Sequence, residues 1–139
     1  MTRTRQIIYL SIVFLTLTFI SCSEIKTNDP NKTYMYWAGT NPPNDLEVLN
    51  GQYWESAHWT KEYIMFLKIK PTTEWWDEFI KQNHLSLNKG KWTKPSDAPV
   101  WFNPTENTIE YNSSDILNDQ SRFLRDTLTG VCFIYEIQL

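Results

Sequence analysis

The stretch that decides the fold is Tyr63–Ile69, which reads Tyr-Ile-Met-Phe-Leu-Lys-Ile. Successive side chains of a β-strand point to opposite faces, so the stretch divides into two sets. Both sets begin with apolar residues, which is typical of a central strand that is partly covered on each side. One face holds Tyr63, Met65, Leu67 and Ile69, and the other holds Ile64, Phe66 and Lys68.

A helix is predicted directly after this strand, over residues 73–83. Thr72 or Thr73 provides a hydroxyl that can cap the free amides of the first turn, and Asn83 is a typical stop. Acidic side chains in the first turns suit the helix dipole. Apolar side chains recur at spacings of three and four, which predicts a stripe that packs against the sheet rather than a ligand platform. The stripe consists of Trp75, Trp76, Phe79 and Ile80.

The remaining elements are predicted to be short strands. Asn50-Gly51 is a strong hairpin signal between two apolar runs. Residues 121–126 and 131–139 bracket a turn, which predicts a terminal hairpin. We also expect strands at Tyr34–Trp37 and Thr108–Tyr111, an irregular Leu85–Pro104 and a helical turn at Ser113-Ser114-Asp115. The predicted class is α+β: an antiparallel sheet of about five strands with one main helix (73–83) on one face.

The amino terminus has the pattern of a targeting segment. Arg3 and Arg5 precede Ile7–Ile20, an apolar run of 14 residues. As a helix this run extends roughly 21 Å at about 1.5 Å per residue, which is less than a hydrocarbon core of roughly 30 Å. A permanent membrane-spanning helix is therefore disfavoured, although an uncleaved anchor is the alternative.

The four residues Phe19-Ile20-Ser21-Cys22 resemble the lipobox of bacterial lipoprotein precursors. The resemblance implies a lipidated Cys22 and a signal peptide over residues 1–21. It also implies a membrane anchor of three acyl chains, each CH₂ adding about 0.8 kcal/mol. Ser23, which stands where an Asp would favour the inner membrane, implies the outer membrane. Residues 22–33 then read as the lipidated cysteine and a flexible tether, followed by a single domain over residues 34–139.

Composition narrows the possible partners. Residues 22–139 carry 11 basic and 16 acidic side chains, a formal net charge of −5, so nucleic acid is not an expected partner. If Cys22 is lipidated, Cys132 has no disulfide partner. It lies within an apolar run, so we expect a buried and inert thiol.

No catalytic pattern is present. His58, Glu62 and Glu55 would be neighbours on a helix, but their surroundings read as strand or loop, and a local hydrogen-bonding role is the simpler interpretation. Four glycines offer no phosphate-binding loop, and no nucleophile elbow occurs. We therefore predict no enzymatic activity, no cofactor and no metal.

The aromatic content suggests a binding function. Residues 22–139 hold 18 aromatic side chains, including all seven Trp, and Trp suits protein interfaces. The leading prediction is a lipid-anchored protein that binds a protein partner in the periplasm or at the cell surface, such as an inhibitor or immunity-type protein. The alternative is surface glycan binding through exposed Trp and Tyr rings, and a third possibility is a small hydrolase with dispersed acids. The candidate partner-binding residues are Trp54, Trp59, Trp92 and Trp101.

Overall fold

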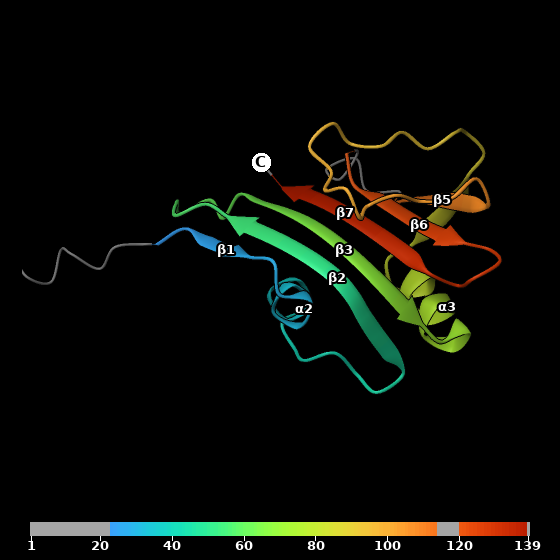
Figure 1. Ribbon diagram of the computed structural model, residues 1–139, viewed down its shortest axis with the longest axis horizontal. Helices are drawn as coiled ribbons and strands as arrows, with labels where there is room; N and C mark the ends of the chain where they lie inside the picture. Colours follow the sequence, from blue (N-terminus) through green and yellow to red (C-terminus); the bar gives the residue numbers. More distant parts are fainter. Residues whose placement is uncertain (1–22, 114–119, 139) are drawn as a thin grey trace, which may run out of the picture.

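The computed structural model describes residues 23–113 and 120–138, which form an α+β fold (Figure 1). Seven antiparallel strands make one sheet in the order β1-β2-β3-β7-β6-β5-β4, and two helices pack against it. The predicted class is therefore confirmed, but the sheet has seven strands rather than about five and there are two helices rather than one. The strands are β1 (Ile25–Thr27), β2 (Leu46–Glu55), β3 (Tyr63–Pro71), β4 (Leu85–Asn88), β5 (Thr108–Ser113), β6 (Arg122–Asp126) and β7 (Cys132–Gln138), and the helices are α2 (Pro30–Ala38) and α3 (Thr73–Gln82).

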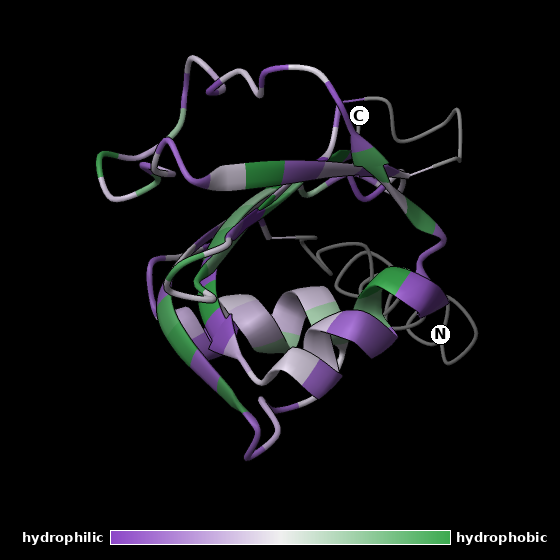
Figure 2. Cartoon of the chain, turned by 90° about the vertical axis from the view of Figure 1, so that its right-hand side faces the viewer, coloured by the Kyte–Doolittle hydropathy of each residue, from purple (hydrophilic) through white to green (hydrophobic). Residues whose placement is uncertain are grey.

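Strand β3 is central and is covered on both faces, as its alternation predicts. Its Met65, Leu67 and Ile69 belong to the core beneath the helices, which lie on one side of the curved sheet (Figure 2). On the other face Phe66 packs edge-on against Phe102, at a ring-centroid distance of 5.2 Å. Phe102 belongs to the long connection between β4 and β5, so this irregular segment covers the second face of the sheet.

Helix α3 confirms the predicted helix. The side chain of Thr72 accepts a hydrogen bond from the amide of Trp75 at 3.2 Å, which caps the first turn. Trp76 and Phe79 are buried against the sheet, which confirms core packing for these two residues of the stripe, whereas Trp75 and Ile80 are half-buried at its edge. The helix ends at Asn83, whose backbone amide donates to the carbonyl of Phe79.

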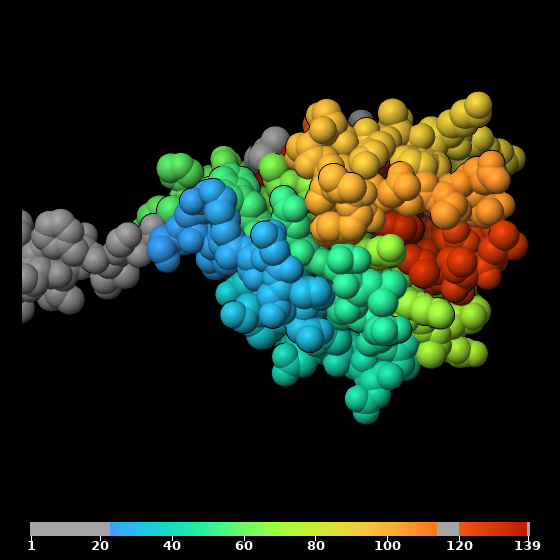
Figure 3. Space-filling view, viewed as in Figure 1, coloured from blue at the N-terminus to red at the C-terminus, as the bar shows by residue number. Residues whose placement is uncertain are grey.

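The segment before β2 differs from its prediction. Tyr34–Trp37 was predicted to be a strand, but it lies within α2, which Asp29 caps by accepting a hydrogen bond from the amide of Lys32. Pro30 occupies the first turn, where its missing N–H costs nothing. β1 pairs with β2, and β1 and α2 lie against β2 as part of the folded body (Figure 3). The prediction of a flexible tether over 22–33 is therefore wrong for residues 25–27 and 30–33.

The hairpin predicted at Asn50-Gly51 is also wrong. Strand β2 runs through both residues, and Gly51 is paired with Leu67 of β3. An irregularity in the register between Val48 and Asn50 accommodates one extra residue, which is a β-bulge. Gly51 is needed for close approach instead of a turn, because a Cβ there would lie 2.6 Å from the Cβ of Thr33 in α2.

The terminal hairpin is confirmed by the antiparallel pairing of β6 with β7. Its turn is organised by Asp126, whose carboxylate accepts hydrogen bonds from the amides of Leu128 and Thr129 at 2.9 and 2.8 Å. Gly130 follows with φ of 72°, a left-handed conformation that glycine adopts without strain. The strand expected at Thr108–Tyr111 is confirmed as β5, whereas the helical turn expected at 113–115 falls mostly outside the described residues.

Candidate functional site

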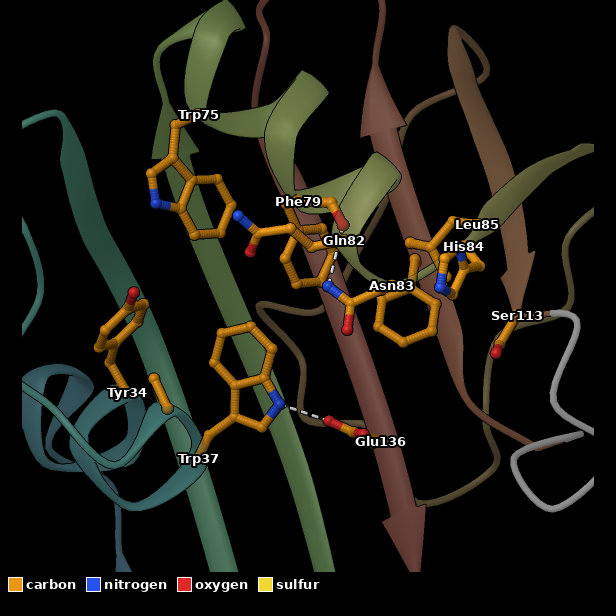
Figure 4. Close-up of a pocket in the computed structure, with 12 residues that line it drawn as sticks. Tyr34, Trp37, Trp75, Phe79, Gln82, Asn83, His84, Leu85, Ser113 and Glu136 are labelled. Atoms are coloured by element: carbon orange, nitrogen blue, oxygen red, sulfur yellow. Dashed lines mark hydrogen bonds between the residues drawn. The ribbon is translucent and has the colours of Figure 1, made fainter.

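A pocket of about 470 Å³ opens where the ends of the two helices meet the carboxyl-terminal part of the sheet (Figure 4). This volume falls within the range of small-molecule sites. Aromatic, amide and hydroxyl side chains line it together with one imidazole and one carboxyl group. The lining residues are Tyr34, Trp37 and Ala38 of α2; Trp75, Phe79 and Gln82 of α3; and Asn83, His84, Leu85, Ser113, Phe123 and Glu136.

Both helices end at this pocket, and each ends for a local reason. Helix α2 stops at Gly39, which has φ of 70° and donates its amide to the carbonyl of Met35. Helix α3 stops at Asn83, whose side-chain amide donates to the carbonyl of Phe79 at 2.9 Å. His84 then takes φ of 51°, which turns the chain into β4. Helix carboxyl ends carry partial negative charge, so two such ends border one pocket.

Three aromatic rings form one wall of the pocket. Trp75 stacks on Phe79 with a centroid distance of 5.2 Å and an interplanar angle of 9°. Trp37 lies on the other side of Phe79, 5.8 Å away and tilted by 55°. Figure 4 shows that Trp37 comes from α2 and the other two rings from α3, so the wall exists only when both helices are in place.

Glu136 of β7 is the acidic group of the pocket. It pairs with Met65 of β3 and therefore projects from the face of the sheet that the helices cover. The indole Nε1 of Trp37 donates a hydrogen bond to its Oε2. Burial raises the pKa of Glu136, although hydrogen bonds from Trp37 and Tyr63 act in the opposite direction. The pKa of the neighbouring phenol, Tyr63, is shifted as well. Burial and the charge of Glu136 raise it to about 12.

No cation neutralises this carboxylate within the part of the chain that the structure describes. The ion pairs found there join Lys26 with Glu24, Lys81 with Glu78 and Arg122 with Glu110. A carboxylate has about four lone-pair positions, and the two donors Trp37 and Tyr63 do not fill all of them.

The four predicted partner-binding tryptophans do not line this pocket, and they do not share one environment. Trp59 is 98% exposed in the connection between β2 and β3. Trp54 is half-buried on β2, where its indole donates to Glu24. Trp92 and Trp101 are also half-buried, because they pack on the second core beneath the β4–β5 connection. Cys22 lies outside the described residues.

Sequence reasoning did not find Glu136, although a signal for it was present. On β7, alternation places Glu136 on the same face as Cys132 and Ile134, so a charged residue follows two apolar ones toward the core. Trp37 was assigned to a strand, which hid its relation to Phe79. The residues that line the pocket come from five segments distant in the chain, so spacing alone could not reveal it.

The remaining predictions concern Cys132, His58, a metal site and a membrane-spanning helix. Cys132 is buried and free, which confirms the predicted buried thiol, and burial raises its thiol pKa to about 12. His58 is exposed in the connection after β2. Residues 23–113 and 120–138 contain no group of three or more His, Cys, Asp and Glu side chains placed to hold a metal ion. Within the same ranges, no helix has the length and apolar character needed to cross a membrane.

Comparisons with protein-family models, with curated proteins and with solved structures gave no match.

Proposed function

We propose that this chain is a lipid-anchored binding protein of the bacterial envelope that captures a small ligand in the pocket between α2, α3 and β7, without catalysing a reaction. The observation that carries the proposal is the placement of the Glu136 carboxylate beside a wall of aromatic rings. A concave aromatic site with a small number of polar groups at fixed positions is typical of specific ligand binding. The lipobox-like Phe19-Ile20-Ser21-Cys22 supports the anchor.

A binding role is preferred because the groups around Glu136 hold it in place. Trp37 donates to the carboxylate from α2, and Tyr63 reaches it from β3. Both donors come from the folded body, so the carboxylate is oriented before any ligand arrives. Preorganisation of this kind reduces the entropic cost of binding.

The test is NMR spectroscopy of the lipidated protein in detergent micelles, with the indole N–H signals of Trp37 and Trp75 as reporters. A panel of small amines, carboxylates, neutral sugars and neutral aromatic compounds is titrated. We expect at least one compound to shift both signals at sub-millimolar concentration. The sugars in the panel also test the glycan alternative.

Two variants distinguish the pocket from non-specific binding. Ala38→Trp places a large side chain at the edge of the pocket and should abolish the shifts. Thr40→Trp adds the same group at an exposed position two residues later and should leave them intact. If no compound shifts either signal, or if Ala38→Trp binds as well as the wild type, the proposal is wrong.

A second candidate function, docking of a protein partner, is favoured by Trp59. A tryptophan that is 98% exposed at a loop is a typical interface anchor. A photo-crosslinking amino acid placed at residue 59 in living cells should form one dominant adduct, and the same group at Val100, which is 93% exposed, should not. Equal labelling from both positions would contradict specific docking at Trp59.

A further inference from the structure

We infer that the ligand of this pocket carries a positively charged ammonium group, which is held between the Glu136 carboxylate and the rings of Trp37 and Trp75. The inference rests on the proposed function, because it requires the pocket to bind a ligand. It adds the chemical class of that ligand.

The charge of Glu136 favours a positively charged ligand. Glu136 is held in a partly buried position, and no lysine, arginine or histidine among the described residues forms an ion pair with it. Removing a carboxylate from water without a counter-charge is unfavourable. An ammonium group in the pocket would supply that counter-charge, and the open lone-pair positions of the carboxylate would accept its N–H groups where it has them.

The arrangement of the aromatic rings also favours a positively charged ligand. Trp75 and Phe79 are nearly parallel, whereas Trp37 is tilted by 55° relative to Phe79. Phe79 is buried and also stacks on Trp76 at 5.5 Å, so the half-buried rings of Trp37 and Trp75 are the ones that offer π-faces to the pocket. A cation is attracted to such faces when it lies within about 6 Å of a ring centroid, and Trp gives the strongest attraction. Carboxylate and rings together favour an organic cation over a strongly hydrated metal ion, for which the described residues offer no ligand cluster.

The direction of helices α2 and α3 favours a positively charged ligand too. Ala38 is the last residue of α2 and Gln82 the last of α3, and both line the pocket. The carboxyl ends of the two helices thus add partial negative charge to that of Glu136. Helix α2 has no basic residue in its last turn, and Lys81 of α3 lies 4.0 Å from Glu78.

Other ligand classes fit the same pocket less well. An anion would meet the carboxylate and both helix ends, and His84, the one basic lining residue among those described, is exposed. A neutral sugar would stack on the rings but would leave the carboxylate without a counter-charge. Among the amines, carboxylates, neutral sugars and neutral aromatic compounds of the panel, only the ammonium group satisfies the rings and the charge together.

The experiment compares two pairs of compounds that differ in charge but hardly in shape: choline with 3,3-dimethylbutan-1-ol, and cyclohexylmethylamine with cyclohexylmethanol. Affinity is measured by isothermal titration calorimetry and by the Trp37 and Trp75 indole signals. We expect the cation of at least one pair to bind ten-fold or more tightly than its neutral partner. Glu136→Gln should remove that preference, and Glu47→Gln, at an exposed position on β2, should retain it.

The outcomes separate this inference from the proposed function. If neutral and charged partners bind equally, or if only sugars or acids from the wider panel occupy the pocket, the inference is overturned and the proposed function stands. If no compound occupies the pocket, both are overturned. A preference for the cation that survives in Glu136→Gln, with the NMR spectrum showing a folded protein, would overturn the assigned role of Glu136.

Discussion

At the scale of single residues, the raised pKa of Glu136 makes the stability of the ligand-free protein fall as the pH rises. Burial raises its pKa above the ordinary value of 4.5, so the folded state favours the protonated form more than the unfolded state does. The contribution of Glu136 to stability is therefore complete below about pH 4.5 and is lost as the pH rises through the raised folded value.

Glu136→Gln should consequently raise the melting temperature at pH 7.5 and have a smaller effect at pH 4. The amide retains an oxygen that accepts from Trp37 but carries no charge to desolvate. Thermal unfolding at both pH values measures this, with the exposed Glu47→Gln as the control. A lower melting temperature at pH 7.5 would mean that the bonds to the ionised carboxylate outweigh the cost of burial.

The pKa of Asp126 is shifted in the opposite direction to that of Glu136. Hydrogen bonds from the hydroxyl of Thr105 and the amides of Thr129 and Leu128 lower its pKa from 3.8 to about 2. Its contribution to stability is present above pH 3.8 and is lost as the pH falls through 2. Asp126→Asn should lower the melting temperature at pH 7 and flatten its decline between pH 4 and pH 2. An unchanged acid limb in circular dichroism melts would contradict this assignment.

At the scale of elements, the packing of α2 on β2 depends on the absence of a side chain at residue 51. A Cβ at Gly51 would lie 2.6 Å from the Cβ and 2.7 Å from the Oγ1 of Thr33, and 3.0 Å from the Cα of Pro30. The Cα of Pro30 is a backbone atom and the Cβ of Thr33 is fixed by the backbone. The clash can therefore be relieved only if α2 moves away from the sheet. Trp37 would move with it and leave Glu136 and Phe79.

Gly51→Ala should therefore destabilise the protein by about 1–3 kcal/mol, the usual cost of overpacking a tight core. It should also weaken ligand binding in the pocket. Gly90→Ala is the matched control, because the new Cβ would meet only the side chain of Asn88, at 3.3 Å or more. Urea unfolding curves measure both variants, and equal midpoints for the two would contradict close helix–sheet contact at Gly51.

At the scale of the whole molecule, the proposed anchor and the folded body lie close together in the chain. Strand β1 begins at Ile25, three residues after Cys22. At about 3.5 Å per extended residue, a lipid on Cys22 would hold the sheet within roughly 10 Å of the bilayer surface. With a lipid on Cys22, this short connection would leave the body little freedom to move away from the membrane.

Cys22→Ser, exported behind a leader that is cleaved without lipidation, should no longer be held on membranes, because the acyl chains that a lipidated Cys22 would carry would supply nearly all of the anchoring free energy. Partition into a detergent phase and membrane flotation measure this directly. Cys132→Ser is the control, since that thiol is buried in the core and should have no effect on partition. Continued flotation of Cys22→Ser would contradict the lipoprotein assignment.

Where the deciding forces are local, the sequence by itself determined the structure. Alternation over Tyr63–Ile69, the cap at Thr72 and the turn before Gly130 predicted β3, α3 and the terminal hairpin, since each depends on neighbouring residues. Helix α2 also had local signals, in Asp29, Pro30 and Gly39. The strand preference of the aromatic residues between them concealed these signals.

Only the tertiary structure decided what depends on contacts across the chain. Asn50-Gly51 reads as a turn by local rules, but pairing with β3 makes both residues part of a continuous strand, and the approach of α2 leaves no room for a side chain at Gly51. The pocket likewise unites Trp37, Phe79 and Glu136, which lie up to 99 residues apart. Packing energy and the burial of charge act through space rather than along the chain, and for that reason the site was visible only in the fold.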